Sequence, residues 1–340
     1  MSILVDLVSD TATRPTEAMK RAMMSAPVGD EQKGEDPTVR ALEERMAALL
    51  GTERAMFVVS ATMGNQLALA LHAQAGDEIV CHRTAHVLNH ECGGAAMTAR
   101  AQLFPLDTPR GIFTADDVRR VMRTDDPHYP RTRCVVVENT SNGGGGSVWP
   151  LATFDGVAEH CRANGLALHL DGARLFHASV ALGLPVTRLS QGADTVQVGF
   201  SKGLGCAFGA VLGLRSSQWP RARRLKQAMG GCLRQAGIVA GGMLYALDHH
   251  VERLADDHRR ARQLAFGLGA VPGLEVEPVE TNLVYFRATR KRPSEIVDGA
   301  LAAGVRVAAA GADRLRACLH LDIDDAGVER AVRAVEQACR

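Results

Sequence analysis

An acid and a lysine end two apolar stretches of this sequence. Asp171 closes the run LALHLD (166–171), and Lys202 follows the run TVQVGF (195–200). About 30 residues separate them, which leaves room for a helix between two strands of one sheet. In open α/β sheets, ligands collect at the carboxyl ends of strands. On spacing alone, the pair predicts either a buried ion pair or a site in which an uncharged lysine does chemistry.

The second interpretation is a site for pyridoxal phosphate. There a lysine amine forms a Schiff base with the cofactor, and an aspartate keeps the pyridine nitrogen protonated. Lys202 is the only charged residue between Asp194 and Arg215, and an apolar setting favours an uncharged amine. The cofactor phosphate needs backbone N–H groups at a helix start. The stretch AMFVVSATMGNQ (55–66) offers a strand, a turn of small residues and then a helix.

The elements around these residues alternate between strand and helix. Apolar runs predict strands at 55–59, 134–139, 166–171, 195–200 and 209–214, and helical spacing predicts helices at 37–51 and 154–165. This alternation predicts an α/β fold with a mostly parallel central sheet covered on both faces. We expect a large domain over 1–240, which includes the N-terminal segment, a linking helix over 241–268 and a small α+β domain over 269–340.

Composition excludes several classes of protein. The 340 residues carry a net charge of +1, which gives no basic field for nucleic acid. We find no apolar run of membrane-spanning length and no signal-peptide pattern. The eight cysteines are scattered without a C-x-x-C pair, which indicates reduced thiols in a cytoplasmic protein and no zinc site. We therefore expect no metal, no nucleic acid and no membrane partner.

Nine motifs spread over the chain carry a resemblance to a known family. They are LVSDTATRPT (7–16), VGDEQKGEDPT (28–38), TMGN (62–65), TAHVLNHECGGAA (84–96), ENTSNGGGG (138–146), LHLDGARL (168–175), FSKGLG (200–205), LRQAG (233–237) and RACLHLD (316–322). In this order they resemble the threonine aldolase group of the β-eliminating lyase family. Such proteins are pyridoxal-phosphate enzymes of fold type I, the aspartate aminotransferase fold. The resemblance runs from about residue 4 to the end of the chain.

The resemblance implies three groups of site residues. The cofactor-binding group is Ala61, Thr62, His86, Asp171, Arg174, Lys202 and Arg234. The substrate-binding group is Ser9, Lys33, Arg174 and Arg316. The catalytic group is Lys202, His86 and His128.

For the cofactor, the resemblance implies that Lys202 is its attachment point and that Asp171 pairs with its ring nitrogen. Ala61 and Thr62 would bind the phosphate, and His86 would stack on the ring.

For the substrate, the resemblance implies that Ser9, Arg174 and Arg316 hold the carboxylate. His128 would lie near the substrate hydroxyl. Arg234 would reach the phosphate of a neighbouring subunit, so a homodimer or homotetramer with the site at the subunit interface is expected.

Three positions depart from the family pattern. Ala61 stands where the family usually has glycine, Lys33 where it has tyrosine, and Ser141 where it has histidine. Lys33 is either a solvated surface lysine or a cation that favours an acidic β-substituent.

The implied reaction is retro-aldol cleavage of L-threonine, L-allo-threonine and related β-hydroxy-α-amino acids to glycine and an aldehyde. Either His86 or His128 would take the hydroxyl proton. One alternative is β-elimination or dehydration of a β-substituted amino acid such as 3-hydroxyaspartate, with Lys202 as base. Another is a non-catalytic regulator that binds pyridoxal phosphate, but such proteins tend to carry a DNA-binding helix-turn-helix module.

Overall fold

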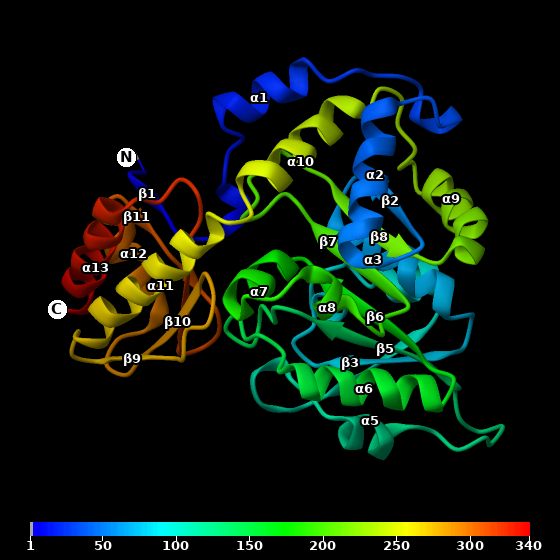
Figure 1. Ribbon diagram of the computed structural model, residues 1–340. Coiled ribbons are helices and arrows are strands. Elements are labelled where there is room, and N and C mark those ends of the chain that lie inside the picture. The colour runs from blue at the N-terminus through cyan, green and yellow to red at the C-terminus, as the bar shows by residue number, and fades with distance from the viewer. Residues whose placement is uncertain (1–2) are drawn as a thin grey trace.

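A seven-stranded sheet forms the centre of the computed structural model, which describes residues 3–340 (Figure 1). In spatial order its strands are β2 (Arg54–Val58), β8 (Ala210–Leu214), β7 (Thr195–Gly199), β6 (Ala167–Gly172), β5 (Thr132–Glu138), β3 (Glu78–His82) and β4 (Gln102–Leu106). Strand β8 is antiparallel to both of its neighbours, and the remaining pairs are parallel. The other six strands therefore share one direction, and their carboxyl ends lie along one edge of the sheet.

Helices cover both faces of this sheet. One apolar core joins it to α1 (Glu17–Met24), α2 (Pro37–Leu50), α5 (Ala115–Val121), α6 (Leu151–Ala163), α7 (Leu175–Leu182), α8 (Val186–Ser190) and α10 (Gly237–His249). Two smaller cores on the other face involve α3 (Ala61–His72), α4 (His86–Asn89), a π-helical turn at Ala95–Ala99 and α9 (Trp219–Ala228). Short 3-10 turns lie at Asp10–Ala12, Glu31–Lys33, Pro109–Gly111 and Ser216–Gln218.

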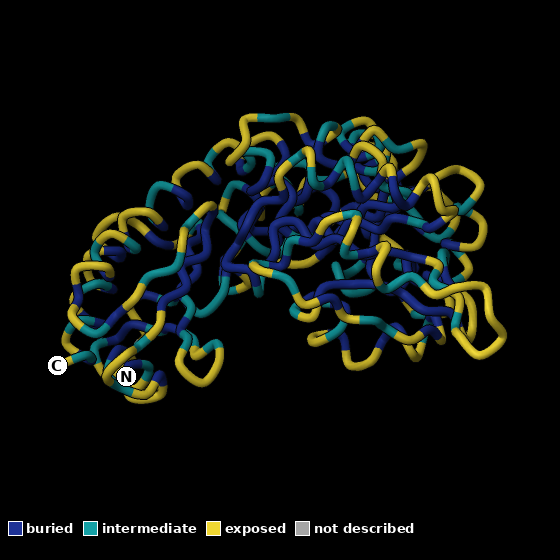
Figure 2. Tube along the Cα trace, turned by 90° about the horizontal axis from the view of Figure 1, so that it is seen from below, coloured by how far each residue is buried: buried dark blue, intermediate teal, exposed yellow. Residues whose placement is uncertain are grey.

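The sequence of β6 explains why polar groups gather on one face of the sheet. Alternate side chains of a strand face opposite sides. Leu168 and Leu170 enter the large apolar core, whereas His169 and Asp171 face α3 and bond to Asn65 there. The central strands are buried (Figure 2). The polar side chains on the α3 side therefore depend on protein groups for their hydrogen bonds.

The small domain lies beside the large one and contains both described ends of the chain (Figure 1). Its antiparallel sheet has the order β12 (Ala308–Ala309), β13 (Arg314–Cys318), β10 (Leu283–Ala288) and β9 (Leu274–Val276). The helices α11 (Leu254–Gly269), α12 (Pro293–Ala302) and α13 (Asp325–Cys339) pack with this sheet. A separate two-stranded sheet pairs β1 (Val5–Asp6) with β11 (Val305–Arg306).

The five predicted strands and two predicted helices are confirmed, with ends that differ by a few residues. Two features differ from expectation. The predicted linking helix is two helices, α10 and α11, interrupted at residues 250–253. The N-terminal segment, which we assigned to the large domain, pairs with β11, because Val5 and Leu7 enter the apolar core of the small domain. Residues 1 and 2 of the predicted large domain lie outside the described residues.

The domain limits at 240 and 268 stay a prediction. Within residues 3–340, no helix combines the length and the apolar character that crossing a membrane requires.

Candidate active site

A cleft of about 340 Å³ opens at the carboxyl ends of β5, β6 and β7. Its lining residues are Ser9, Thr11, His86, His90, Glu138, Thr140, Asn142, Asp171, Ala173, Arg174, Lys202 and Arg316. Six of the residues predicted from the sequence meet here: Ser9, His86, Asp171, Arg174, Lys202 and Arg316. The cleft lies where the edge of the parallel sheet meets the small domain, because Arg316 comes from β13.

Lys202 follows β7 and is half-buried in this cleft. Burial, and after it the guanidinium of Arg174, lower the pKa of its amine. Asp10 and Asp171 act in the opposite direction without cancelling this effect. The sequence placed no acid beside Lys202, but the fold brings carboxylates close to it. An amine with a lowered pKa is more often uncharged at neutral pH and can act as a nucleophile.

Asp171 ends β6 and is almost completely buried. Its Oδ1 accepts a hydrogen bond from the backbone N–H of Ala173 at 3.1 Å, and its Oδ2 accepts one from Nδ2 of Asn65 at 2.9 Å. Both donors are neutral, so neither brings a positive charge that would compete with a proton-bearing ligand atom for the carboxylate. This is the property that a partner for a pyridine nitrogen requires.

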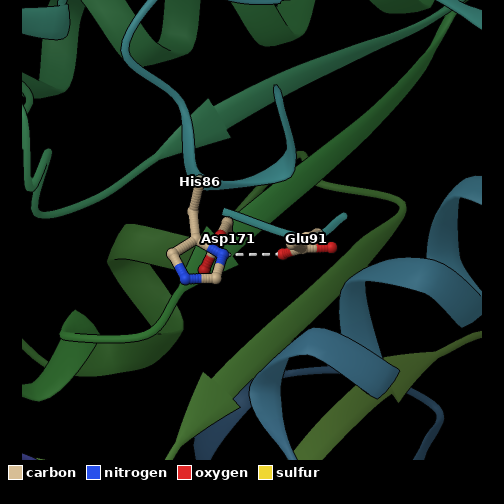
Figure 3. A group of neighbouring side chains, drawn as sticks. All are labelled: His86, Glu91 and Asp171. Atoms are coloured by element: carbon tan, nitrogen blue, oxygen red, sulfur yellow. Dashed lines mark hydrogen bonds and ion pairs between the residues drawn. The ribbon is translucent and has the colours of Figure 1, made fainter. Parts of the chain in front are cut away.

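His86 begins α4, and Glu91 fixes the orientation of its ring. Nδ1 of His86 lies 2.8 Å from Oε1 of Glu91, which is buried (Figure 3). The hydrogen bond to Glu91 raises the pKa of the imidazole, while burial acts to lower it. The backbone N–H of His86 also donates to Oε2 of Glu138 at 2.8 Å. With Nδ1 engaged, Nε2 is the ring nitrogen left for a ligand.

His86, Glu91 and Asp171 approach one another as closely as metal ligands do, with one atom from each lying within 4.8 Å of the others (Figure 3). Hydrogen bonds within the protein already engage Nδ1 of His86 and the carboxylates of Glu91 and Asp171. Glu91 accepts from His86, from Asn65 and, through its other oxygen, from Gln66. We therefore interpret the group as a hydrogen-bonded cluster.

Arg174 lies at the start of α7 and is held by a buried acid that the sequence analysis missed. Its Nε and Nη2 donate to the two carboxylate oxygens of Asp10 at 2.7 and 2.8 Å. Burial alone would raise the pKa of Asp10, but the guanidinium outweighs it and holds this pKa well below its usual range. The pair leaves Nη1 of Arg174 directed to Asn142, whose Oδ1 lies 3.4 Å away.

Arg316 faces the same oxygen from the small domain. Its Nη1 donates to Oδ1 of Asn142 at 3.3 Å, and its Nη2 donates to the backbone carbonyl of Val8 at 2.7 Å. Its Nε is buried and finds no hydrogen-bond partner within residues 3–340. Asn142 thus marks a position between Arg174 and Arg316 where one anionic oxygen would meet two guanidinium groups.

The predicted phosphate-binding residues lie at the start of α3, at the same edge of the sheet. Ala61 and Thr62 are the first two residues of this helix, and their N–H groups lack partners inside it. The N-cap residue, Ser60, accepts from Met63 through its side chain at 3.1 Å. A helix N-terminus, an amine of lowered pKa and a carboxylate with neutral donors form a donor set that fits pyridoxal phosphate.

Ala61 and Thr62 do not line the cleft itself, and three further predicted site residues lie away from it in their own chain. The side chain of His128 is 87% exposed in the loop before β5 and bonds to Asp126 at 2.8 Å, at the edge of the sheet opposite the cleft. Arg234 is 60% exposed and pairs with Asp30 at 3.0 Å. Lys33 is exposed at the end of a short 3-10 turn.

The structure also shows the surroundings of Ala61 and Ser141, the other two residues that depart from the family pattern. Ala61 is half-buried at the first position of α3. Ser141 is buried, and its Oγ accepts from the backbone N–H of Gly144 at 3.2 Å.

Several residues that support the cleft were not identified from the sequence: Asp10, Asn65, Glu91, Glu138, Asn142 and His169. All six lie inside the motifs named above, where other residues carried the predicted roles. His169 alternates with Asp171 in β6, so the strand period could have placed it on the same face.

Comparisons with known proteins show which family this chain belongs to. A family model described as beta-eliminating lyase matches residues 6–290. A protein of Arabidopsis thaliana named probable low-specificity L-threonine aldolase 2 is 37% identical over 352 residues, which cover 98% of this chain and 96% of that protein. The low specificity L-threonine aldolase of Escherichia coli (strain K12) is 38% identical over 321 residues, covering 94% and 95%.

Solved structures give the fold. A threonine aldolase of Leishmania major has a TM-score of 0.86 at 20% identity and is matched over 99% of this chain and all of that one (100%). An aspartate aminotransferase of Rhizobium meliloti has a TM-score of 0.71 at 17% identity, covering 99% and 91%. These likenesses confirm the predicted fold type I. Together with the family match over most of its length, they establish that this chain belongs to the beta-eliminating lyase family.

Proposed function

We propose that this protein cleaves L-threonine, L-allo-threonine and related β-hydroxy-α-amino acids to glycine and an aldehyde, with pyridoxal phosphate as its cofactor. The observation that carries the proposal is the meeting of Lys202, Asp171 and two arginines in one cleft. The relatives of near-equal length that are named low-specificity L-threonine aldolase support the same reaction.

When bound, pyridoxal phosphate supplies a conjugated ring that takes up electrons from a bond to the substrate α-carbon. Four residues of this chain would hold it. Lys202 offers its amine as the attachment point, and Asp171 keeps a proton on the ring nitrogen. Ala61 and Thr62 offer backbone N–H groups to the phosphate.

Two arginines select the bond that breaks. Arg174 and Arg316 face one position beside Asn142 and would bind the substrate carboxylate there. Holding the carboxylate would fix the rotation about the substrate α-carbon and so decide which of its bonds breaks. For aldol cleavage the clamp would have to present the Cα–Cβ bond. The Asp10–Arg174 pair keeps the clamp rigid.

We assign the proton acceptor to His86. Aldol cleavage needs a base at the β-hydroxyl, and Nε2 of His86 is available for this because Glu91 holds Nδ1. His128 lies at the opposite edge of the sheet in the same chain.

We also propose that the protein is a cytoplasmic homodimer or homotetramer. The exposed Arg234 and Lys33 lie on adjacent segments, because the N–H of Glu31 donates to the carbonyl of Arg234 at 2.9 Å. Such a surface is suited to reach the site of a second copy. The eight cysteines are all free, which supports a reducing compartment.

The test is to purify the protein, add pyridoxal phosphate and record its visible absorbance. The loaded protein is then given L-threonine, L-allo-threonine, phenylserine and 3-hydroxyaspartate in turn while glycine and aldehyde are assayed. We expect both products, and we expect Lys202→Ala to lose the absorbance band and turnover. Ammonia with 2-oxobutyrate from threonine, in place of glycine, would contradict the proposal. Light scattering on the same sample gives the oligomer mass against the 36.3 kDa of one chain.

A further inference from the structure

Helix α3 packs closely on the sheet because Gly64 has no side chain. A Cβ at Gly64 would lie 2.7 Å from Cγ of Gln197 on β7, which is closer than a Cβ comes to another atom in folded proteins. The close packing brings the next residue, Asn65, into contact with β6. Asn65 is 1% exposed, so each of its polar atoms depends on the protein for a partner.

The amide of Asn65 joins three groups. Its Nδ2 donates to Oε1 of Glu91 at 2.7 Å and to Oδ2 of Asp171 at 2.9 Å. Its Oδ1 lies 3.0 Å from Nε2 of His169. One neutral side chain therefore donates a hydrogen bond to each of two buried acids. Asp171 is the proposed partner of the cofactor ring nitrogen, and Glu91 bonds to His86.

Behind Asn65 the hydrogen bonds continue as a chain. Nδ1 of His169 lies 2.9 Å from Oγ1 of Thr195, its register partner on β7. Nε2 of His72, at the end of α3, lies 2.9 Å from the same hydroxyl. Burial lowers the pKa of His169 to about 4 and that of His72 to about 3, so both rings are neutral.

The direction of this chain follows from its ends. Two carboxylates can only accept, so both hydrogens of the Asn65 amide point to them and Oδ1 faces His169. Nε2 of His169 then carries the ring hydrogen, and Nδ1 accepts from Thr195. The Thr195 oxygen in turn accepts from Nε2 of His72. Each hydrogen in this chain of hydrogen bonds therefore has one assigned donor atom. The donors point from His72 towards Asp171 and Glu91.

A neutral donor at this position has a chemical consequence. Two carboxylates in one site repel each other unless a donor lies between them. A lysine or arginine between them would prevent this, but its charge would also weaken the hold of Asp171 on a protonated ring nitrogen. The amide of Asn65 stabilises both carboxylates without adding charge.

We propose that Asn65 is a positioning residue that holds the carboxylates of Asp171 and Glu91 in place, with His169 fixing the orientation of its amide. This inference rests on the proposed function. Asn65 and His169 touch no substrate; they act through Asp171 on the cofactor nitrogen and through Glu91 on His86.

The test measures the cofactor itself. Asn65→Leu keeps the side-chain size and removes the donors. We expect it to bind pyridoxal phosphate about 10- to 100-fold more weakly than wild type, the range for a lost hydrogen bond to a charged group. The visible band of the bound cofactor should also change in position and in its response to pH. Ser190→Ala, which removes a buried hydrogen bond of 2.7 Å to the carbonyl of Leu50, is the control and should leave the band unmoved.

A second pair of variants keeps the test valid if Asn65→Leu does not fold. His169→Gln retains an N–H near the position of Nε2 and should behave nearly as wild type. His169→Leu leaves Oδ1 of Asn65 without a donor and should lose about 10-fold in cofactor affinity. Unchanged affinity and band in Asn65→Leu and His169→Leu would overturn this inference while the proposed function stands. A wild-type protein that gains no band would overturn the proposed function.

Discussion

In the proposed mechanism His86 is the base of the cleft, and Glu91 holds its ring. Glu91 accepts the Nδ1 hydrogen of His86 at 2.8 Å and raises the pKa of its imidazole against the effect of burial. A raised pKa means that His86 keeps its second proton to a higher pH. Nε2 can take the β-hydroxyl proton only after that proton has left, so activity should rise with pH through the pKa of His86.

Glu91→Gln tests this arrangement. A neutral amide can still accept from Nδ1, but it stabilises the imidazolium less, so the pKa of His86 falls. The acidic limb of kcat/KM against pH should therefore move to lower pH.

The control for Glu91→Gln is Asp126→Asn, which removes the carboxylate beside the exposed His128. It should leave the limb in place. A limb that moves with Asp126→Asn and stays fixed with Glu91→Gln would assign the base to His128.

At the scale of elements, the spacing between α3 and the sheet positions Asn65 and the start of α3, where we propose that the cofactor phosphate binds. Gly64 sets this spacing, because a Cβ there would lie 2.7 Å from Cγ of the fully buried Gln197. The Cγ atom lies near the root of the side chain and cannot easily move aside. Any displacement of α3 also displaces Asn65 and the phosphate-binding start of the helix.

Gly64→Ala should therefore destabilise the protein by about 1–3 kcal/mol, the usual cost of overpacking, and weaken cofactor binding as well. Gly156→Ala is the matched control, since it lies inside helix α6 and a Cβ there would have no neighbour within 4 Å. That variant should gain about 0.5–1 kcal/mol from helix propensity. Urea unfolding and cofactor titration of both variants measure the difference, and equal effects would contradict the role of Gly64.

The elements with long apolar runs could be predicted from the sequence. Strand β5 contains a continuous apolar run, and Asp171 and Lys202 stand out because they follow the mostly apolar runs of β6 and β7. Strand β1 could not be predicted, because two residues carry no periodicity and its partner, β11, lies at the other end of the chain.

The residues that support the site were harder to predict than those that line it. Their types are visible, but their partners depend on packing. Asn65 reaches Asp171 only because Gly64 lets α3 approach, and Asp10 reaches Arg174 only because the N-terminal segment crosses between the domains. His169 is the exception, since the period of β6 places it beside Asp171.

For the whole molecule, Asp10 connects three parts of the chain. It follows β1, which pairs with the small domain. Its carboxylate binds Arg174 of the large domain through two hydrogen bonds, and Oδ2 also accepts from Nδ2 of Asn282 in the small domain at 3.1 Å. Asp10 is fully buried, so these contacts replace water completely.

Asp10→Asn should cost about 3–5 kcal/mol of unfolding free energy, because it leaves the buried Arg174 without a counter-charge. Asp107→Asn breaks the exposed pair with Arg83 and should cost at most about 1 kcal/mol. The lowered pKa of Asp10 means that its stabilisation is complete above the unfolded value of 3.8 and fades as the pH falls further. The gap between wild type and Asp10→Asn in urea unfolding should thus be full at pH 7 and shrink below about pH 4. A gap that stays constant with pH, or matches that of Asp107→Asn, would show that this buried charge does not hold the two domains together.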